Sequence, residues 1–309
     1  MRAIRIVEPG PLATVQDRGR YGFRSWGVPL SGAMDRQALR IGNLLAGNGD
    51  AAAGVEITVG GFRTEFLCDA HFAVTGADFS PALNGASVSC WRSHSVKKGD
   101  TLSLGSGASG MRAYLAVAGG IDTPPVMNSR STYPRGGFGG LDGRPLRAGD
   151  VLPLGEAPAG HRAALDMPEL IPPYSTFPTL RVVMGPQDDS ITPRGAEVFL
   201  SGTYDVTARS DRMGSALSGP VIELVSGADI LSDGTCPGAV QVHGNGQPTI
   251  LTADCQTTGG YAKVATVVSV DLPLIAQLAP GNRVRFEAVE LSRARELYLR
   301  NEFLLGKLR

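Results

Sequence analysis

The sequence contains few of the residues that metal and redox sites require. Its four cysteines and four histidines are scattered, and no two cysteines form a C-x-x-C pair, which argues against a zinc ribbon or a thioredoxin-type motif. No apolar run reaches the roughly 18 residues of a membrane-spanning helix. The first six residues lack the apolar segment of a signal peptide. We therefore expect a cytoplasmic protein with free thiols and no metal site.

The chain also lacks an excess of either charge. Its 309 residues include 29 Lys and Arg and 29 Asp and Glu, so the formal net charge is zero. This balance argues against nucleic acid as the main partner, because neutralising phosphates needs a basic excess. The sequence contains neither a G-x-x-x-x-G-K-[ST] loop nor a G-x-S-x-G elbow. A P-loop nucleotide site and an α/β-hydrolase nucleophile are therefore excluded.

Glycine and proline, in contrast, are abundant, with 41 and 21 residues. The hydrophobic fraction is an ordinary 42%, so this composition indicates a folded chain with many turns, typical of many short strands. Alternating or β-branched residues predict strands at 55–59, 72–75, 112–118 and 264–270.

Three segments predict helices. The first covers 31–45, where apolar residues recur on one face and Ser31 is the expected N-cap. The second covers 193–200, because Thr192 is a good cap and a proline follows it at the first helical position. The third covers 291–305, with its apolar residues on one stripe.

A proline-rich stretch at 157–178 is the natural linker and divides the chain near residue 165. We therefore predict a mainly β protein with two lobes, 1–165 and 166–309. Each lobe is expected to be a barrel or a strongly bent sheet, with a few short helices.

Four polar clusters lie beside glycines, which let the backbone approach a ligand closely. They cover 16–22, 129–133, 210–214 and 254–261. The last cluster interrupts apolar strands, and only Cys255, expected to be a buried, inert thiol, would suit a buried strand. It is the one cluster that indicates a site by itself. For 16–22 and 210–214 we slightly favour turns in which Asp caps local amides. Arg130 and Ser131 could bind a carboxylate or phosphate, or could belong to a solvated loop.

Together these clusters resemble one family, the allophanate hydrolase subunit 2 group, also called the biotin-dependent carboxyltransferase family. The resemblance extends over the whole chain. It is carried by the strings PGP (9–11), DRGR (17–20), GAMD (32–35), RAYLAVAGGI (112–121), SRST (129–132), SDRMG (210–214), QP (247–248) and QTTGGY (256–261). The resemblance implies cyclophilin-like β-barrel lobes, which agrees with the two β lobes predicted above.

The resemblance implies one of two chemistries. In the first, 5-oxoprolinase opens 5-oxo-L-proline to L-glutamate with ATP, and the chain works with A and B subunits, with ATP bound with or by a partner subunit. In the second, a carboxyltransferase moves a carboxyl group from biotin to urea or a similar amide. The chain has no Met-Lys pair typical of a biotin carrier, which favours the first. A third alternative is a non-catalytic antagonist that binds a kinase-inhibitor-like B subunit.

Both chemistries need donors around an amide or ureido oxygen that gains negative charge, and an acid or base near the amide nitrogen. Our hypothesis is that the acid or base is Asp254, Asp211 or Asp17. The expected substrate-binding residues are Gln256, Thr257, Thr258, Gly259, Gly260, Tyr261, Arg130, Ser131 and Arg212. We expect four of these side chains to converge on one cleft: Asp17, Arg130, Asp211 and Gln256. The change Asp254→Asn should then abolish turnover while the protein stays folded.

Overall fold

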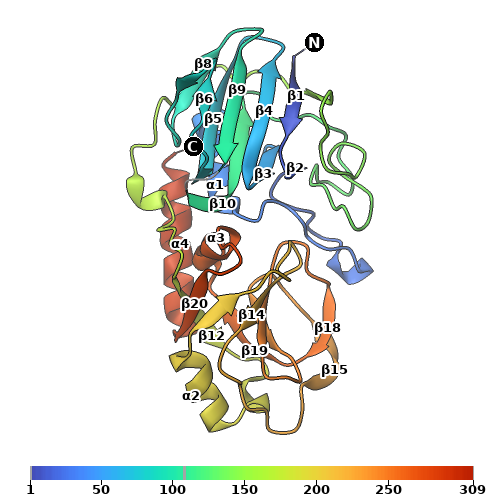
Figure 1. The fold of residues 1–309 in the computed structure, drawn as a ribbon, viewed down its shortest axis with the longest axis vertical. Coiled ribbons are helices and arrows are strands. Elements are labelled where there is room, and N and C mark those ends of the chain that lie inside the picture. Colours follow the sequence, from blue (N-terminus) through green and yellow to red (C-terminus); the bar gives the residue numbers. More distant parts are fainter. Residues whose placement is uncertain (1, 107–108, 309) are drawn as a thin grey trace. The chain divides into compact units, whose positions relative to one another are not determined.

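A computed structural model describes residues 2–106 and 109–308 of the chain (Figure 1). The chain forms two compact units. The first unit comprises Met1–Tyr21, Ser31–Ile171 and Leu305–Arg309, and the second comprises Gly22–Leu30 and Pro172–Leu304. Over the described ranges, every helix is too short or too polar to span a bilayer.

The first unit is built from two antiparallel sheets. The six-stranded sheet has the order β11 (Val151–Pro153), β1 (Ala3–Pro9), β4 (Gly60–Phe66), β9 (Thr101–Ser106), β6 (Ala82–Leu83), β7 (Ala86–Ser87). The five-stranded sheet has the order β2 (Leu12–Gln16), β3 (Gly54–Thr58), β10 (Ser109–Val117), β5 (Ala70–Asp78), β8 (Ser93–Val96). Apolar side chains from both sheets form one core, which includes Ile4, Phe66, Val55, Phe72 and Leu115.

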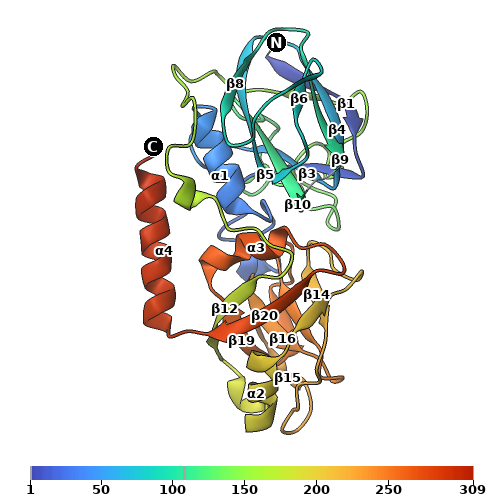
Figure 2. The ribbon, with the colours of Figure 1, turned by 60° about the vertical axis from the view of Figure 1, so that its left-hand side comes forward.

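Helix α1 (Arg36–Leu45) lies against β5 and β10, as Figure 2 shows. The predicted N-cap, Ser31, is wrong. The helix instead begins after Asp35, whose carboxylate accepts the backbone N–H of Ala38 at 2.9 Å. Ser31 does not cap a helix because the two amides that its hydroxyl would accept are engaged elsewhere: Ala33 donates to the Asp17 carbonyl and Met34 to the Glu56 carboxylate.

The second unit contains a closed seven-stranded barrel. Its order is β12 (Thr179–Met184), β19 (Lys263–Val267), β16 (Ala239–Val242), β17 (Pro248–Leu251), β14 (Gly214–Ser218), β13 (Tyr204–Val206), β20 (Arg283–Ala288). Parallel pairing of β12 with β20 closes the ring. Strands β15 (Asp229–Gly234) and β18 (Thr258–Tyr261) form a separate two-stranded ribbon.

The remaining helices are short, except for the last one. They are α2 (Pro193–Ser201), α3 (Leu272–Ala276) and α4 (Leu291–Gly306), with 3-10 turns η1 (Arg24–Trp26), η2 (Pro168–Leu170), η3 (Asp188–Ser190) and η4 (Ser269–Asp271). The helices predicted at 193–200 and 291–305 are confirmed, and Thr192 caps α2 by accepting the Gly195 amide at 2.9 Å. The strand predicted at 264–270 ends earlier, at Val267, because η4 follows it.

The prediction of a mainly β protein is confirmed, and the second unit contains the expected barrel. The prediction of a barrel in the N-terminal lobe needs correction: over the described residues, that unit consists of two separate open sheets. Alternating apolar residues fix which face of a strand is buried, but they do not decide whether the two edges of a sheet meet. This is why the sequence could not distinguish a closed barrel from open sheets in the first lobe.

Because of two stacked histidines, we expect the stability of the first unit to depend on pH. The ring of His71, on β5, stacks on that of His161 with centroids 3.7 Å apart. Burial, and then the charge of His161, lower the pKa of His71 below its usual 6.5. Between the lowered pKa and 6.5 the unfolded chain therefore binds more protons than the folded chain, so stability should fall as the pH drops through this window.

The test is urea denaturation between pH 7.5 and 5.5. The variant His161→Asn removes the neighbouring charge, and we expect it to lose less stability over this range than the unaltered protein. An identical pH slope in both proteins would show that the charge of His161 does not contribute to the pH dependence.

Candidate functional site

In the first unit, the Asp17 carboxylate joins two of the predicted clusters. It accepts hydrogen bonds from four donors: the hydroxyls of Ser129 and Ser131, and the backbone amides of Gly19 and Arg130. Asp17 and Ser131 are 114 residues apart in the sequence. The structure thus brings Asp17, Arg130 and Ser131 together, and the contacts of the carboxylate hold these loops in place.

Arg20, a member of the 16–22 cluster to which the sequence assigned no role of its own, completes this group. Arg20 is fully buried, and its guanidinium donates to the carbonyls of Val126 and Ser131 at 3.0 and 2.6 Å. It also lies over the ring of Phe138, 4.9 Å from the centroid. The Arg130 guanidinium is more accessible and pairs with Asp122 at 2.5 Å. Arg20 therefore shapes the 129–133 loop, whereas Arg130 points its charge toward the surface.

In the second unit, Arg212 and Asp254 form a buried bidentate ion pair. Nε and Nη2 of Arg212 each donate to one carboxylate oxygen of Asp254 at 2.9 Å, and the two side chains are 9% and 5% exposed. The backbone amide of Asp254 also donates to the Arg212 carbonyl at 2.8 Å. The pair joins the 210–214 and 254–261 clusters, and its geometry gives both residues a fixed position.

Asp211, beside this pair, has the geometry of the turn considered from the sequence. Its Oδ1 accepts the backbone amides of Met213 and Gly214 at 2.7 and 3.2 Å. The residue is exposed, unlike Asp254. Of the three carboxylates predicted as acid or base, Asp211 is therefore the one with ready access to solvent.

The 254–261 segment leads into β18 and is held by η1 and by the chain just after β15. The carbonyl of Gln256 accepts from the Thr235 hydroxyl at 2.5 Å and from Nη2 of Arg24 at 3.3 Å. The side-chain amide of Gln256 lies 3.5 Å from Oε1 of Gln241, which is 2% exposed. A Cβ on Gly259 would lie 2.7 Å from Nε2 of Gln241, so a larger residue here would have to displace that amide.

The other members of the segment differ in exposure. Thr258 and Tyr261 are exposed, whereas Thr257 and Gly260 are half-buried. The carbonyl of Thr257 accepts the amide of Thr235 at 3.0 Å. The Tyr261 ring meets the ring of His243 edge-on, with centroids 4.6 Å apart. Hydroxyl, amide and aromatic groups are thus presented along one short ribbon.

Lys263 is the main functional candidate that the sequence reasoning missed. It is the first residue of β19, its side chain is only 5% exposed, and Nζ donates to Oδ2 of Asp233 at 2.9 Å. The Lys263 ammonium in turn lowers the pKa of the Asp233 carboxyl. One signal was available: a lysine at the head of a β-branched strand segment needs a partner if it is buried.

The two cysteines in and beside the 254–261 segment, Cys255 and Cys236, are poor nucleophiles. Burial raises the pKa of the Cys255 thiol, although Arg24 opposes the shift. Burial likewise raises the pKa of Cys236. Both thiols are therefore protonated at neutral pH, and a protonated thiol is a poor nucleophile. The expectation that Cys255 is buried is confirmed.

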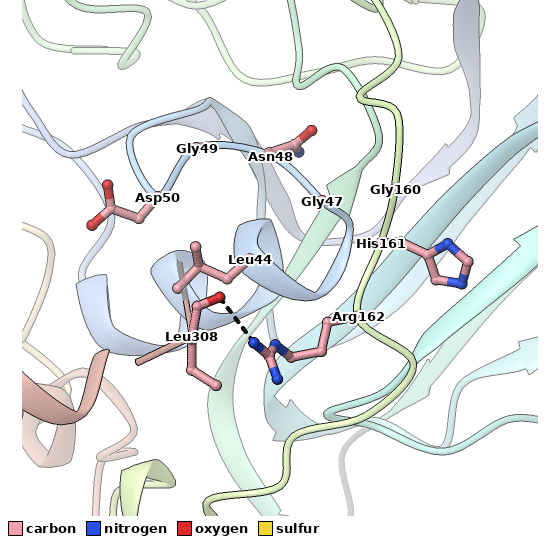
Figure 3. A pocket seen from close by; sticks show the side chains of 9 residues that line it. All are labelled: Leu44, Gly47, Asn48, Gly49, Asp50, Gly160, His161, Arg162 and Leu308. Atoms are coloured by element: carbon pink, nitrogen blue, oxygen red, sulfur yellow. Dashed lines mark hydrogen bonds between the residues drawn. The ribbon is translucent and has the colours of Figure 1, made fainter. Parts of the chain in front are cut away.

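A separate open pocket of ≈ 740 Å³ lies in the first unit, where α1 ends. Arg162 donates to the Leu308 carbonyl across it at 3.4 Å (Figure 3). Its lining residues are Leu44, Gly47, Asn48, Gly49, Asp50, Gly160, His161, Arg162 and Leu308. This lining contains none of the predicted site residues, so the pocket is distinct from the candidate site.

The sequence matches a known family model over most of its length. Residues 26–288 match the model described as carboxyltransferase domain, subdomain A and B. The chain belongs to this carboxyltransferase family. The resemblance noted from the sequence is thereby confirmed.

Two similar proteins are bacterial 5-oxoprolinase subunits. The chain is 40% identical over 292 residues to the C subunit of 5-oxoprolinase from Escherichia coli (strain K12), covering 94% of this chain and 93% of that protein. It is 36% identical over 306 residues to the C subunit of 5-oxoprolinase from Haemophilus influenzae, covering 99% and 97%. The likeness therefore extends over nearly the whole of both proteins.

The fold is also similar to part of a much larger enzyme of the same family. The crystal structure of the K. lactis urea amidolyase superimposes with a TM-score of 0.95 at 32% identity. The match covers 99% of this carboxyltransferase-family chain and 20% of that chain. The family fold thus occurs both in separate subunits and inside a longer polypeptide.

The structure leaves one expectation about the site open. Asp17 and Arg130 lie in the first unit, and Asp211 and Gln256 lie in the second. Their convergence on one cleft stays a prediction.

Proposed function

We propose that the chain is the C subunit of an ATP-dependent 5-oxoprolinase, which hydrolyses 5-oxo-L-proline to L-glutamate in the cytoplasm together with A and B subunits as partners. The observation that carries this proposal is the 40% identity across 93% of the Escherichia coli protein. Urea amidolyase of Saccharomyces cerevisiae is less similar, at 34% identity, and the chain covers 17% of it. The closed barrel of the second unit supports, for that unit, the cyclophilin-like architecture that the family implies.

The chemistry explains why ATP is needed. A lactam carbonyl is a poor electrophile because resonance with the nitrogen stabilises it. Transfer of a phosphoryl group from ATP to the carbonyl oxygen, which releases ADP, creates a leaving group, and water then opens the ring as phosphate departs. We assign ATP binding to, or together with, a partner subunit. This sequence has no P-loop, so a nucleotide site formed by this chain would be of another kind. Biotin belongs only to the alternative in which the chain acts as a carboxyltransferase.

The residues of this chain would bind and orient the amide. The side chains of Gln256, Thr257 and Thr258 and the amides of Gly259 and Gly260 are the proposed donors toward the amide oxygen, and Tyr261 closes the ribbon beside them. The hypothesis made from the sequence also includes three further substrate-binding residues: Arg130, Ser131 and Arg212. This role suits the accessible Arg130, whereas the contacts of Ser131 and Arg212 favour support of the site.

The three carboxylates are proposed to have different roles. Asp211 is exposed and is the proposed acid or base at the amide nitrogen. Asp17 and Asp254 are each engaged by several donors, and we propose that they position the loops that carry the binding groups.

The test is a choice between substrates by the reconstituted complex. The chain is co-expressed with its A and B subunits, and the complex is incubated with ATP and either 5-oxoproline, or urea with a carboxylated biotin carrier as the carboxyl donor. We expect glutamate release from 5-oxoproline and no carboxylation of urea. Urea carboxylation without glutamate release would favour the carboxyltransferase alternative. A stable complex with the B subunit that turns over neither amide would favour the antagonist.

A further inference from the structure

The ammonium of Lys263 is buried in the second unit with fewer acceptors than it can use. An ammonium carries three N–H donors and no acceptor. Among residues 2–106 and 109–308, the one hydrogen bond of Nζ is to Oδ2 of Asp233, although the lysine side chain is only 5% exposed. A buried charge is stable only when it is paired and hydrogen-bonded. The remaining donors of Lys263 therefore indicate a place for an additional or alternative acceptor.

The acceptor that Lys263 now has is a surface carboxylate, whose Oδ1 also accepts the Gly234 amide at 2.7 Å. Asp233 lies on β15, most of which is exposed, and its own side chain is 57% exposed. The pairing of β15 with β18 shifts its register between Asp229 and Asp233, so the ladder is interrupted next to this carboxylate. A soluble carboxylate could replace Asp233 without breaking a buried contact of the barrel.

Two amide side chains lie close to the ammonium. Gln241 of β16 pairs with Lys263 of β19 just after a register shift in the ladder, and paired residues on neighbouring strands bring their side chains close together. Nε2 of Gln256 approaches Oε1 of Gln241 at 3.5 Å, a length at which the bond is weak and easily exchanged. Gly259 has no side chain to cover these groups. A cation and two amides thus lie close together, and Nε2 of Gln241 also donates to the Tyr261 carbonyl at 3.3 Å.

We propose that Lys263 binds the carboxylate of the amide substrate in place of Asp233, and that Gln241 and Gln256 receive the neighbouring amide group. The identity of the substrate rests on the function proposed above. 5-Oxoproline suits this arrangement because its carboxylate is on the carbon next to the lactam nitrogen. Asp233 acts as an internal competitor that keeps the ammonium paired when no substrate is bound.

The test compares two ligands that differ only in the carboxylate. Calorimetric titration of the reconstituted complex measures the Kd of 5-oxoproline and of 2-pyrrolidinone, the same lactam without the carboxylate. For Lys263→Met we expect 5-oxoproline to bind about 10- to 100-fold more weakly, as is typical for a lost charged hydrogen bond, and 2-pyrrolidinone to bind within about twofold of the unaltered complex. Equal weakening of both ligands would overturn the proposal.

A second variant tests the proposal if the Lys263→Met chain does not assemble with its partner subunits. Asp233→Asn changes an exposed residue and weakens the internal competitor, so 5-oxoproline should bind several-fold more tightly. Unchanged or weaker binding would contradict the proposal. A matched control is Lys97→Met, which removes another lysine that pairs with an aspartate at 2.9 Å, and it should leave both Kd values unchanged.

Glutamate release separates this inference from the proposed function. In one outcome, the unaltered complex releases glutamate, but the Lys263 and Asp233 variants bind 5-oxoproline with the same Kd as the unaltered complex. The proposed carboxylate site is then wrong, and the proposed function stands. If the Kd values change as expected but no glutamate is released with ATP, the carboxylate site stands and the proposed function is wrong.

Discussion

The change Asp254→Asn is expected to lower the free energy of unfolding by about 3–5 kcal/mol, because it leaves a buried guanidinium without its charge partner. Both oxygens of Asp254 are engaged by Arg212, and both side chains are almost fully buried. Arg212→Met should cost a similar amount, since it leaves a buried carboxylate. Urea denaturation of each variant measures the loss.

A double variant provides the decisive comparison for this pair. Arg212→Met with Asp254→Leu removes both charges, so its loss should be clearly smaller than the sum of the two single losses. As a control, Arg5→Met removes one partner of the surface pair between Arg5 and Glu65, whose side chains are 46% and 29% exposed, and it should cost less than about 1 kcal/mol. If Asp254→Asn were as stable as the unaltered protein, the pair would not be stabilising.

This expectation changes how the activity of Asp254→Asn must be interpreted. From the sequence, we expected the variant to lose turnover while staying folded. The buried pair means that lost turnover and lost stability should come together, so activity has to be compared at equal folded fraction. Full activity of the folded fraction would remove Asp254 from the catalytic candidates.

The change Gly139→Ala is expected to destabilise the first unit by about 2–4 kcal/mol, through backbone strain and overpacking together. Gly139 has a φ of 74°, and a Cβ there would collide with the Ser131 carbonyl and approach Nη2 of Arg20 at 2.7 Å. The collision falls on the bond by which Arg20 holds the 129–133 loop.

The same loop offers a matched control for this change. Gly137 has a φ of 66°, but a Cβ there would meet no atom within 4 Å. Gly137→Ala should therefore cost only the strain of its left-handed backbone, about 1 kcal/mol. Thermal and urea denaturation of both variants tests the difference. Equal losses would show that backbone conformation, and not the contact with Ser131 and Arg20, determines the cost.

The local features of this chain could be predicted from its sequence. Thr192 before a proline predicted the start of α2 correctly, because capping depends on a few adjacent residues. The same reasoning failed at Ser31, because distant acceptors, the carbonyl of Asp17 and the carboxylate of Glu56, engage the amides that follow it. The short helix α3 (Leu272–Ala276) was missed because five residues are too few to show a helical period.

The pairing of the polar clusters could not be predicted. A polar residue beside glycine is visible locally, so all four clusters were found. That Asp17 meets Ser131, or that Arg212 meets Asp254, depends on contacts across 114 and 42 residues. Lys263 was missed for the same reason, since its burial becomes evident only when β16, β19 and β15 are in position.

The predicted division of the chain into 1–165 and 166–309 stays a prediction about independent domains. Its direct test is limited proteolysis followed by separate expression of the fragments. Two fragments that each unfold cooperatively would support it, and fragments that fold only together would contradict it.

The most direct test of the proposed function is to omit this chain from an otherwise complete reaction. ATP-dependent release of glutamate from 5-oxoproline is measured with the A and B subunits and this chain, and then with each one left out in turn. We expect release only when all three are present, and restored release when the purified chain is added back. Undiminished release from the A and B subunits alone would contradict the proposal that this chain is a required component of the enzyme.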